Sequence, residues 1–261
     1  MKWCRMAITD REVYGILDGD EAVVVQGSPF GTYTRTASRM KLTSAQLLIP
    51  VMPSNFYAVG VNYSAHIEWA NTRHKLAIGA PKQADIGYRS PSALIPSGAS
   101  IVIPKDSPGP VEYEAELVAV VGKKAKNLTE REALSCILGY TLGNDVSERS
   151  WQASDRTLWR AKNTDSFKPM GPVIETDLDP MHQHIVVRVN GRTANAYDTD
   201  KMIWSIQHYI SRMTRYLTLY PGDVIWLGTD GACEPELKGG DRVEIEAESI
   251  GILSNPVIKE A

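Results

Sequence analysis

The sequence predicts a mixed α+β protein that is mainly β, with a small β-rich unit over residues 1–50 and a larger domain over residues 51–261. Short apolar runs closed by Gly, Pro, Asn or Asp recur along the chain, as expected for strands joined by tight turns. Helical patterns are few and short. A proline-punctuated apolar stretch at residues 47–53 is typical of a linker, and it sets the boundary between the two parts.

The composition is that of an ordinary soluble globular protein, with 43% hydrophobic and 23% charged residues among 261. A net charge of −3 argues against nucleic-acid binding, which requires a basic surface. No apolar run approaches a membrane span, and residues 1–10 lack the apolar core of a signal peptide, so we expect a cytoplasmic protein without membrane contact. The three cysteines are widely spaced and form no CxxC pair, which argues against disulfides and against a thiolate metal site.

The N-terminal unit contains a strong hairpin signal. Alternating apolar runs at residues 12–17 and 21–25 flank the dipeptide Asp18-Gly19, which favours a tight turn. No pattern in this unit suggests catalysis.

A buried strand is predicted at residues 56–61, and it leads to His66 and Glu68. This spacing suits a general base and the acid that orients it. The alternative, which the spacing alone favours, is that both residues simply begin a surface helix. Residues 70–90 are polar and basic, and they form either a loop that closes over a ligand or a surface insertion without a role.

The segment over residues 111–122 combines alternating acids with an apolar run that ends at Gly122. Its second half is a predicted buried strand, and alternation along a strand places Glu112, Glu114 and Glu116 on one face. Crowded carboxylates repel one another, so this face indicates either a divalent metal site or a charged, solvated strand edge.

Asp145 is the residue that can complete such a site. A capping box at residues 129–132 predicts a helix over residues 133–138, and a strand over residues 139–143 then leads to Asp145. A crossover of this size brings two strand ends together, so we expect Asp145 beside the acidic strand.

Polar side chains suited to ligand binding follow Asp145. Helical spacing at residues 147–152 puts Arg149 and Gln152 on one side of a helical turn, facing one cleft. Further along, Lys162 beside a carboxylate site would hold a substrate anion, although a surface lysine is the usual alternative.

The last third of the chain is again mainly β. A strand that runs into an Asn-Gly turn is predicted at residues 185–192, an amphipathic helix at residues 202–216, and turn–strand pairs at residues 221–231 and 240–246. The sequence contains no GxGxxG, Walker A, HExxH or GxSxG motif.

From about residue 45 onward, the chain resembles the fumarylacetoacetate hydrolase superfamily, in particular its acylpyruvase and 2-hydroxyhepta-2,4-diene-1,7-dioate isomerase branch. The segment YEAEL at residues 113–117 is followed in family order by GYTLGNDVSERSWQ at 139–152 and AKNTDSFKPMGP at 161–172. Supporting matches are VGVNYSAH at 59–66, VNG at 189–191, PGDVI at 221–225 and GILSNPV at 251–257.

The resemblance implies a fumarylacetoacetate hydrolase-type β-roll of mostly antiparallel strands with flanking short helices in residues 51–261, the catalytic domain, and a homodimer. It also implies a Mg²⁺ or Mn²⁺ ion, with Ca²⁺ as a substitute, held by Glu114, Glu116 and Asp145. Three hard oxygen donors agree with these metals rather than with zinc. The other implied site residues are the catalytic His66, Glu68 and Lys162 and the substrate-binding Tyr63, Arg149, Gln152 and Thr229.

Three positions depart from the family pattern. Many members carry an acid three residues after the histidine, where this chain has Trp69, and its acid is Glu68, one residue earlier. Asp230 replaces the proline that usually follows the Gly-Thr pair. Glu112 is an additional acid that we do not expect to bind the metal.

The resemblance therefore implies a metal-dependent hydrolase that cleaves a carbon–carbon bond of a small anionic 1,3-diketo acid, such as an acylpyruvate, in aromatic-compound catabolism. His66, oriented by Glu68, would activate water, and Lys162 with the metal would stabilise the departing enolate. Oxaloacetate decarboxylation, enol–keto isomerisation and hydration follow the same chemistry and remain alternatives. A binding protein without activity is disfavoured by the intact set of acids and Lys162.

Overall fold

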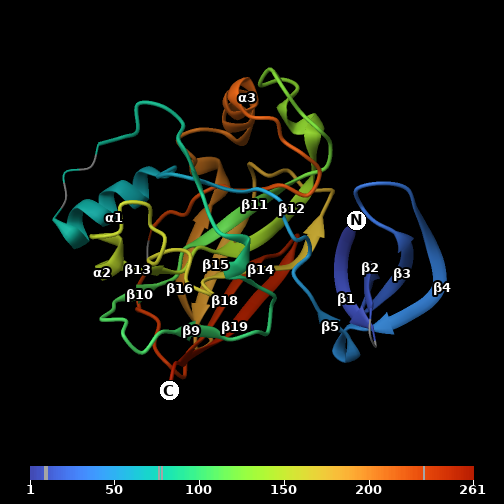
Figure 1. Cartoon of the computed structure of the whole chain (residues 1–261), viewed down its shortest axis with the longest axis horizontal. Coiled ribbons are helices and arrows are strands. Elements are labelled where there is room, and N and C mark those ends of the chain that lie inside the picture. Colours follow the sequence, from blue (N-terminus) through green and yellow to red (C-terminus); the bar gives the residue numbers. More distant parts are fainter. Residues whose placement is uncertain (9–10, 76, 78, 232) are drawn as a thin grey trace.

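A computed structural model describes residues 1–8, 11–75, 77, 79–231 and 233–261 of the chain. It confirms a mixed α+β architecture that is mainly β, with short helices around the sheets (Figure 1). Within these ranges, the strands form a twelve-stranded sheet, a five-stranded sheet and a two-stranded ribbon.

The first strands form an antiparallel meander at the right of Figure 1. They are β1 Lys2–Ile8, β2 Arg11–Asp18, β3 Glu21–Gly27 and β4 Tyr33–Lys41, followed by the 3-10 helix η1 Leu42–Ser44 and β5 Gln46–Leu47. The predicted hairpin is confirmed, because Asp18 pairs with Glu21 around a turn in which Gly19 has a φ of 64°. One end of β1 pairs with β14 (Lys168–Glu175), so these strands extend the main sheet.

The rest of the large sheet has the strand order β1-β14-β12-β11-β17-β6-β7. Its other members are β12 Ile137–Asn144, β11 Ala115–Val121, β17 Val224–Trp226, β6 Phe56–Val59 and β7 Ile86–Tyr88, with β8 Leu94–Ile95 paired to β14. The five-stranded sheet consists of β16 Arg192–Asp198, β15 His184–Val189, β18 Arg242–Ala247, β19 Gly251–Lys259 and β9 Ile101–Ile103. The ribbon pairs β10 Val111–Glu112 with β13 Ser147–Glu148.

The helices are short. They are α1 Ser64–His74, α2 Arg149–Gln152, α3 Ile206–Tyr216 and the 3-10 turns η2 Pro91–Ala93, η3 Ala133–Cys136 and η4 Thr199–Lys201. Of the helices in the described ranges, none has the length and apolar character that crossing a membrane requires.

Strand β11 is buried along its whole length, which explains its continuous apolar sequence. Leu117 and Ala119 pack into one apolar cluster, whereas Val118 and Val120 pack into a second cluster on the opposite face. Full burial of one such aliphatic side chain stabilises the fold by about 1.5–3 kcal/mol. The strand that carries the acids is therefore fixed from both sides.

Three predicted features differ in the structure. Strands β11 and β12 are antiparallel neighbours, so their connection is a long hairpin loop and not a crossover. The helix predicted at residues 133–138 is only the turn η3, because β12 already begins at Ile137, which pairs with Val121. One contact of the capping box forms, since the Thr129 amide donates to Glu132 Oε2 at 3.1 Å. The helix predicted at residues 202–216 begins at Ile206.

Candidate active site

Three carboxylates converge where β11 begins and β12 ends. Glu114 precedes β11, Glu116 is its second residue, and Asp145 follows β12. One oxygen of each lies within 4.8 Å of the others, and the residues are 4%, 3% and 1% exposed. The antiparallel register, with Glu116 opposite Gly143, creates this cluster by placing the start of one strand beside the end of the next.

Buried cations surround the cluster. Lys162 Nζ lies 2.5 Å from Glu114 Oε2 and 2.8 Å from Asp145 Oδ2. Arg89 donates to both oxygens of Asp145, at 3.2 Å and 2.9 Å. Lys168 is fully buried, lies 2.8 Å from Asp145 Oδ1 and also donates to two backbone carbonyls. These contacts fix the orientation of Glu114 and Asp145.

Arg149, at the start of α2, connects the cluster to Glu112 and Gln152. Its Nη2 lies 2.7 Å from Glu114 Oε1, its Nε 2.5 Å from Glu112 Oε2, and its Nη1 2.7 Å from Gln152 Oε1. The prediction that Arg149 and Gln152 share one side of a helical turn is confirmed. Glu112 faces the guanidinium rather than the three-carboxylate cluster.

The ionisation of the three acids differs because their neighbours differ. Burial opposes ionisation of Glu114, but Lys162 and Arg149 outweigh it and hold the pKa of this carboxyl at about 2. Burial likewise opposes ionisation of Asp145, yet its three cationic neighbours hold its pKa well below the ordinary value. Burial raises the pKa of Glu116 to about 8, and the nearby Asp145 and Glu114 carboxylates add to that rise. Glu116 is thus the acid that lacks a compensating positive charge.

The cluster fits a hard divalent cation. It offers three oxygen donors, the ligand type that Mg²⁺ and Mn²⁺ prefer. A cation among them would offset the burial and the like-charge repulsion that raise the pKa of Glu116. The three oxygen donors and the lack of a positive charge paired with Glu116 therefore both agree with a metal site.

The three acids open into a cleft of about 230 Å³, here called the metal cleft. Its walls carry five further predicted site residues: His66, Arg149, Gln152, Lys162 and Thr229. The remaining lining residues are Val59, Gly60, Val61, Arg89, Leu158 and Gly228. The Gly228 amide donates to Glu116 Oε2 at 2.8 Å.

Among the described residues, the loop after β17 holds His66 by a hydrogen bond, whereas no acid does so. Its Nδ1 lies 3.3 Å from the Thr229 carbonyl oxygen, which can only accept, so Nδ1 carries the proton and Nε2 is left as a base. A side chain at Gly231 would come within 2.7 Å of the imidazole, so this glycine permits the close approach of the loop. Burial lowers the pKa of His66, which favours the neutral form.

The structure does not bring Glu68 to His66. Residues two apart on a helix point to different sides, whereas residues three apart share a side. Glu68 is accordingly exposed, and Trp69 lies beside His66 with ring centroids 5.8 Å apart. Tyr63 also lies apart from the lining of the metal cleft: it is 1% exposed and packs edge-on against Tyr197 at 5.3 Å.

Two cations of the site were not identified as such from the sequence. Arg89 was noted only as a basic residue of the segment 70–90, yet it follows β7 and pairs with Asp145. That segment contains the end of α1 and β7, while residues 76 and 78 lie outside the described residues. Lys168 begins a buried strand. A lysine at such a position is rarely buried unless it is paired with an acid, and this was the signal for its role in the site.

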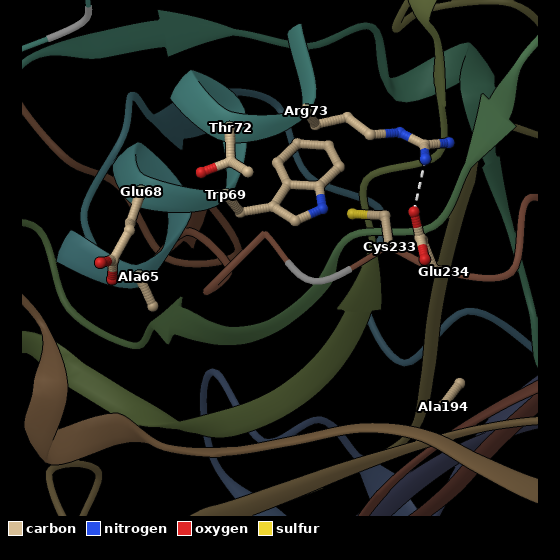
Figure 2. Close-up of a pocket in the computed structure, with 8 residues that line it drawn as sticks. All are labelled: Ala65, Glu68, Trp69, Thr72, Arg73, Ala194, Cys233 and Glu234. Atoms are coloured by element: carbon tan, nitrogen blue, oxygen red, sulfur yellow. Dashed lines mark hydrogen bonds and ion pairs between the residues drawn. The ribbon is translucent and has the colours of Figure 1, made fainter. Parts of the chain in front are cut away.

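Figure 2 shows the lining of a larger hollow of about 610 Å³, here called the outer hollow. It adjoins the metal cleft, because residues of its lining contact His66 and Arg149. Its lining includes Glu68, Trp69 and Cys233. Cys233 Sγ lies 3.9 Å from Arg149 Nη2, and the Arg149 guanidinium lies 5.7 Å from the Trp69 ring centroid. None of the three clustered carboxylates lines this hollow, so we place the chemistry in the smaller metal cleft.

Comparison with known proteins gives a consistent result. The model of the fumarylacetoacetate (FAA) hydrolase C-terminal family matches residues 55–258, and a model described as Rv2993c-like, N-terminal, matches residues 1–50. Protein Rv2993c of Mycobacterium tuberculosis is 35% identical, with 100% of this chain and 99% of the relative covered.

Several similar proteins carry a named activity. The mitochondrial oxaloacetate tautomerase Fahd2a of Rattus norvegicus is 32% identical over 81% of this chain and 69% of its own length. The crystal structure of 5-carboxymethyl-2-hydroxymuconate delta-isomerase from Mycobacterium smegmatis is 34% identical, with a TM-score of 0.89 and both chains covered completely.

Proposed function

The chain belongs to the fumarylacetoacetate hydrolase family, and we propose that it is a divalent-metal-dependent enzyme that interconverts the enol and keto forms of a small dianionic 2-oxo acid. The observation that carries this proposal is the three-carboxylate cluster, buried and ringed by cations, at the floor of the metal cleft. Family relatives include isomerases, hydrolases and an oxaloacetate tautomerase.

The charge of the site selects the substrate. Among the described residues, four buried acids lie with four buried cations, and with every one of these groups ionised, as metal binding requires of Glu116, their formal charges cancel. A divalent ion on Glu114, Glu116 and Asp145 gives a formal excess of two positive charges. A dianionic substrate would restore neutrality. The metal cleft is smaller than the roughly 300–1,000 Å³ of drug-sized ligand sites, so the substrate must be a small molecule.

When bound, Mg²⁺ or Mn²⁺ supplies Lewis-acid polarisation of the substrate's carboxylate and 2-oxo oxygens. Arg149 and Gln152 are assigned to the substrate carboxylates, and Thr229 to a further polar contact in the same wall. Arg149 reaches the cleft already fixed by two carboxylates and one amide, so its donor geometry is set before a substrate arrives.

The proton transfer is assigned to His66. Its neutral Nε2 removes a proton from carbon 3 of the keto form, and the electron pair of that C–H bond becomes the C2–C3 double bond. Negative charge develops on the oxygen of carbon 2, where the Lys162 ammonium stabilises it until it takes a proton from water, and His66 Nε2 then gives the proton it removed to water. The same steps in reverse convert enol to keto.

Isomerisation is preferred to hydrolysis because of the position of Glu68. Hydrolytic cleavage requires an activated water, and the acid expected to assist His66 in that role lies on the other side of α1. Hydrolysis of an acylpyruvate is the second candidate, since the Thr229 carbonyl orients His66 in place of an acid. In that reaction His66 would deprotonate water instead of carbon.

The two reactions are separated by their products. Enolic oxaloacetate is mixed with the protein and Mg²⁺, and its ultraviolet absorbance is followed together with keto product consumed by malate dehydrogenase. Pyruvate, measured with lactate dehydrogenase, reports decarboxylation of oxaloacetate or cleavage of an added acylpyruvate.

We expect the protein to accelerate the loss of the enol form without releasing pyruvate, and we expect EDTA or Glu116→Gln to abolish this acceleration. The control Glu248→Gln changes an exposed acid in the same way and should retain activity. Metal-dependent release of pyruvate from the acylpyruvate, without tautomerisation of oxaloacetate, would establish the second candidate instead.

The homodimer, the domain boundary at residue 50 and the cytoplasmic location remain predictions. None of them is needed for the chemistry above, because every group named in it belongs to one chain.

A further inference from the structure

The metal cleft and the outer hollow are neighbours that share no lining residue among those described. Trp69 faces the outer hollow from α1, and its ring also contacts two residues of the metal cleft. Its centroid lies 5.8 Å from that of His66, and the guanidinium of Arg149 lies 5.7 Å from it. Figure 2 shows the indole projecting from α1 toward Cys233. The indole thus stands between the two spaces.

We propose that Trp69 determines substrate length, by closing the metal cleft against the outer hollow so that only small 2-oxo acids fit. This inference rests on the proposed function, since it concerns the same site. Removal of the indole would join the metal cleft of about 230 Å³ to the outer hollow of about 610 Å³. The enlarged site would accept a 2-oxo acid that carries an additional group on carbon 3.

The other parts of this boundary are less suited to control access. Arg149 is fixed by ionic contacts with Glu112 and Glu114, and its loss would disturb the carboxylate cluster itself. Cys233 is small and almost fully buried. Trp69 is only partly buried and sits on an exposed helix, so its truncation leaves the framework of the site intact.

The lining of the outer hollow indicates which additional group would fit. Ala65, Ala194 and Cys233 give it an apolar surface once the indole is removed. At the rim, Arg73 is already paired with Glu234, at 2.5 Å (Figure 2), and also with Glu236. The remaining rim charge is therefore negative, which disfavours a second anionic group. An uncharged phenyl or alkyl group is the expected occupant.

The test compares two ligands that differ by a phenyl ring. Pyruvate and phenylpyruvate are titrated into the Mg²⁺-loaded protein by isothermal calorimetry, for the wild type, Trp69→Ala and Trp69→Phe. For Trp69→Ala we expect phenylpyruvate to bind about tenfold more tightly, while pyruvate affinity changes by less than about threefold. Trp69→Phe should give an intermediate gain, which keeps the test available if the alanine variant folds poorly.

Thr72→Ala is the matched control. Thr72 lies on the same helix and lines the same outer hollow, but it is absent from the metal-cleft lining. It should leave both affinities unchanged. The inference is overturned if phenylpyruvate gains nothing in either Trp69 variant, or if both ligands change by the same factor. Because binding is measured directly, a protein without tautomerase activity but with the selective gain would refute the proposed function and retain the role of Trp69.

Discussion

Replacement of Lys162 by methionine tests whether this ammonium and the metal stabilise the same carboxylates. The side chain is 7% exposed and lies 2.5 Å from Glu114 and 2.8 Å from Asp145. Removing one partner of a buried ion pair costs about 3–5 kcal/mol. Other cations still compensate both acids, so we expect the lower end of that range, about 3 kcal/mol. For a chain of this size, the fall in Tm should be about 6–12 °C in EDTA.

Saturating Mg²⁺ should reduce this difference. Ligand at a hundredfold excess over its Kd stabilises a protein by about 2.7 kcal/mol, and binding is tighter where a competing positive charge has been removed. Differential scanning calorimetry should therefore show that the difference in Tm between wild type and Lys162→Met in Mg²⁺ is less than half of the difference measured in EDTA. Lys201→Met is the control, because that lysine is on the surface and its loss should cost no more than about 0.5 kcal/mol. A gap that is the same with and without Mg²⁺ would refute the shared role.

Three further outcomes are expected. Because Glu116 has a pKa of about 8 without metal and must lose its proton to bind one, Mg²⁺ affinity by calorimetry should rise roughly tenfold or more from pH 6 to pH 8.5 and then level off. Gly231→Ala should lower kcat by about tenfold or more while leaving Mg²⁺ affinity unchanged, since the new methyl group meets His66 and the φ of 85° disfavours a side chain. Glu112→Gln should leave Mg²⁺ affinity within about threefold, because this acid faces Arg149 and not the carboxylate cluster.

Each of these outcomes has a result that contradicts it. A Mg²⁺ affinity that does not change between pH 6 and pH 8.5 would exclude Glu116 as a ligand. In EDTA, the raised pKa of Glu116 also means that the folded protein binds an extra proton, so this group's contribution to stability should fall as pH rises from about 4.5 to 8. Unchanged turnover in Gly231→Ala would show that the position of His66 is not critical. Loss of metal binding in Glu112→Gln would place a fourth acid in the site.

The sequence alone located the elements of the site because local patterns encode them. A strand buried on both faces must be continuously apolar, and acids at its start then stand out, so the pattern singled out Glu112, Glu114 and Glu116. The family resemblance then selected Glu114 and Glu116 among them. The turn at Asp18-Gly19 and the helical spacing of Arg149 and Gln152 are equally local, and both are confirmed.

Tertiary structure decided what lies across from these elements. The antiparallel pairing of β11 and β12, rather than the crossover we expected, brings the start of one strand to Asp145. Arg89 and Lys168 reach the same carboxylate from segments whose sequence does not show which acid they contact. The family resemblance suggested an acid beside His66, whereas the turn of α1 places Trp69 there. Contacts of this kind depend on strand register and helix rotation over long sequence separations, and a pattern within a few residues does not contain that information.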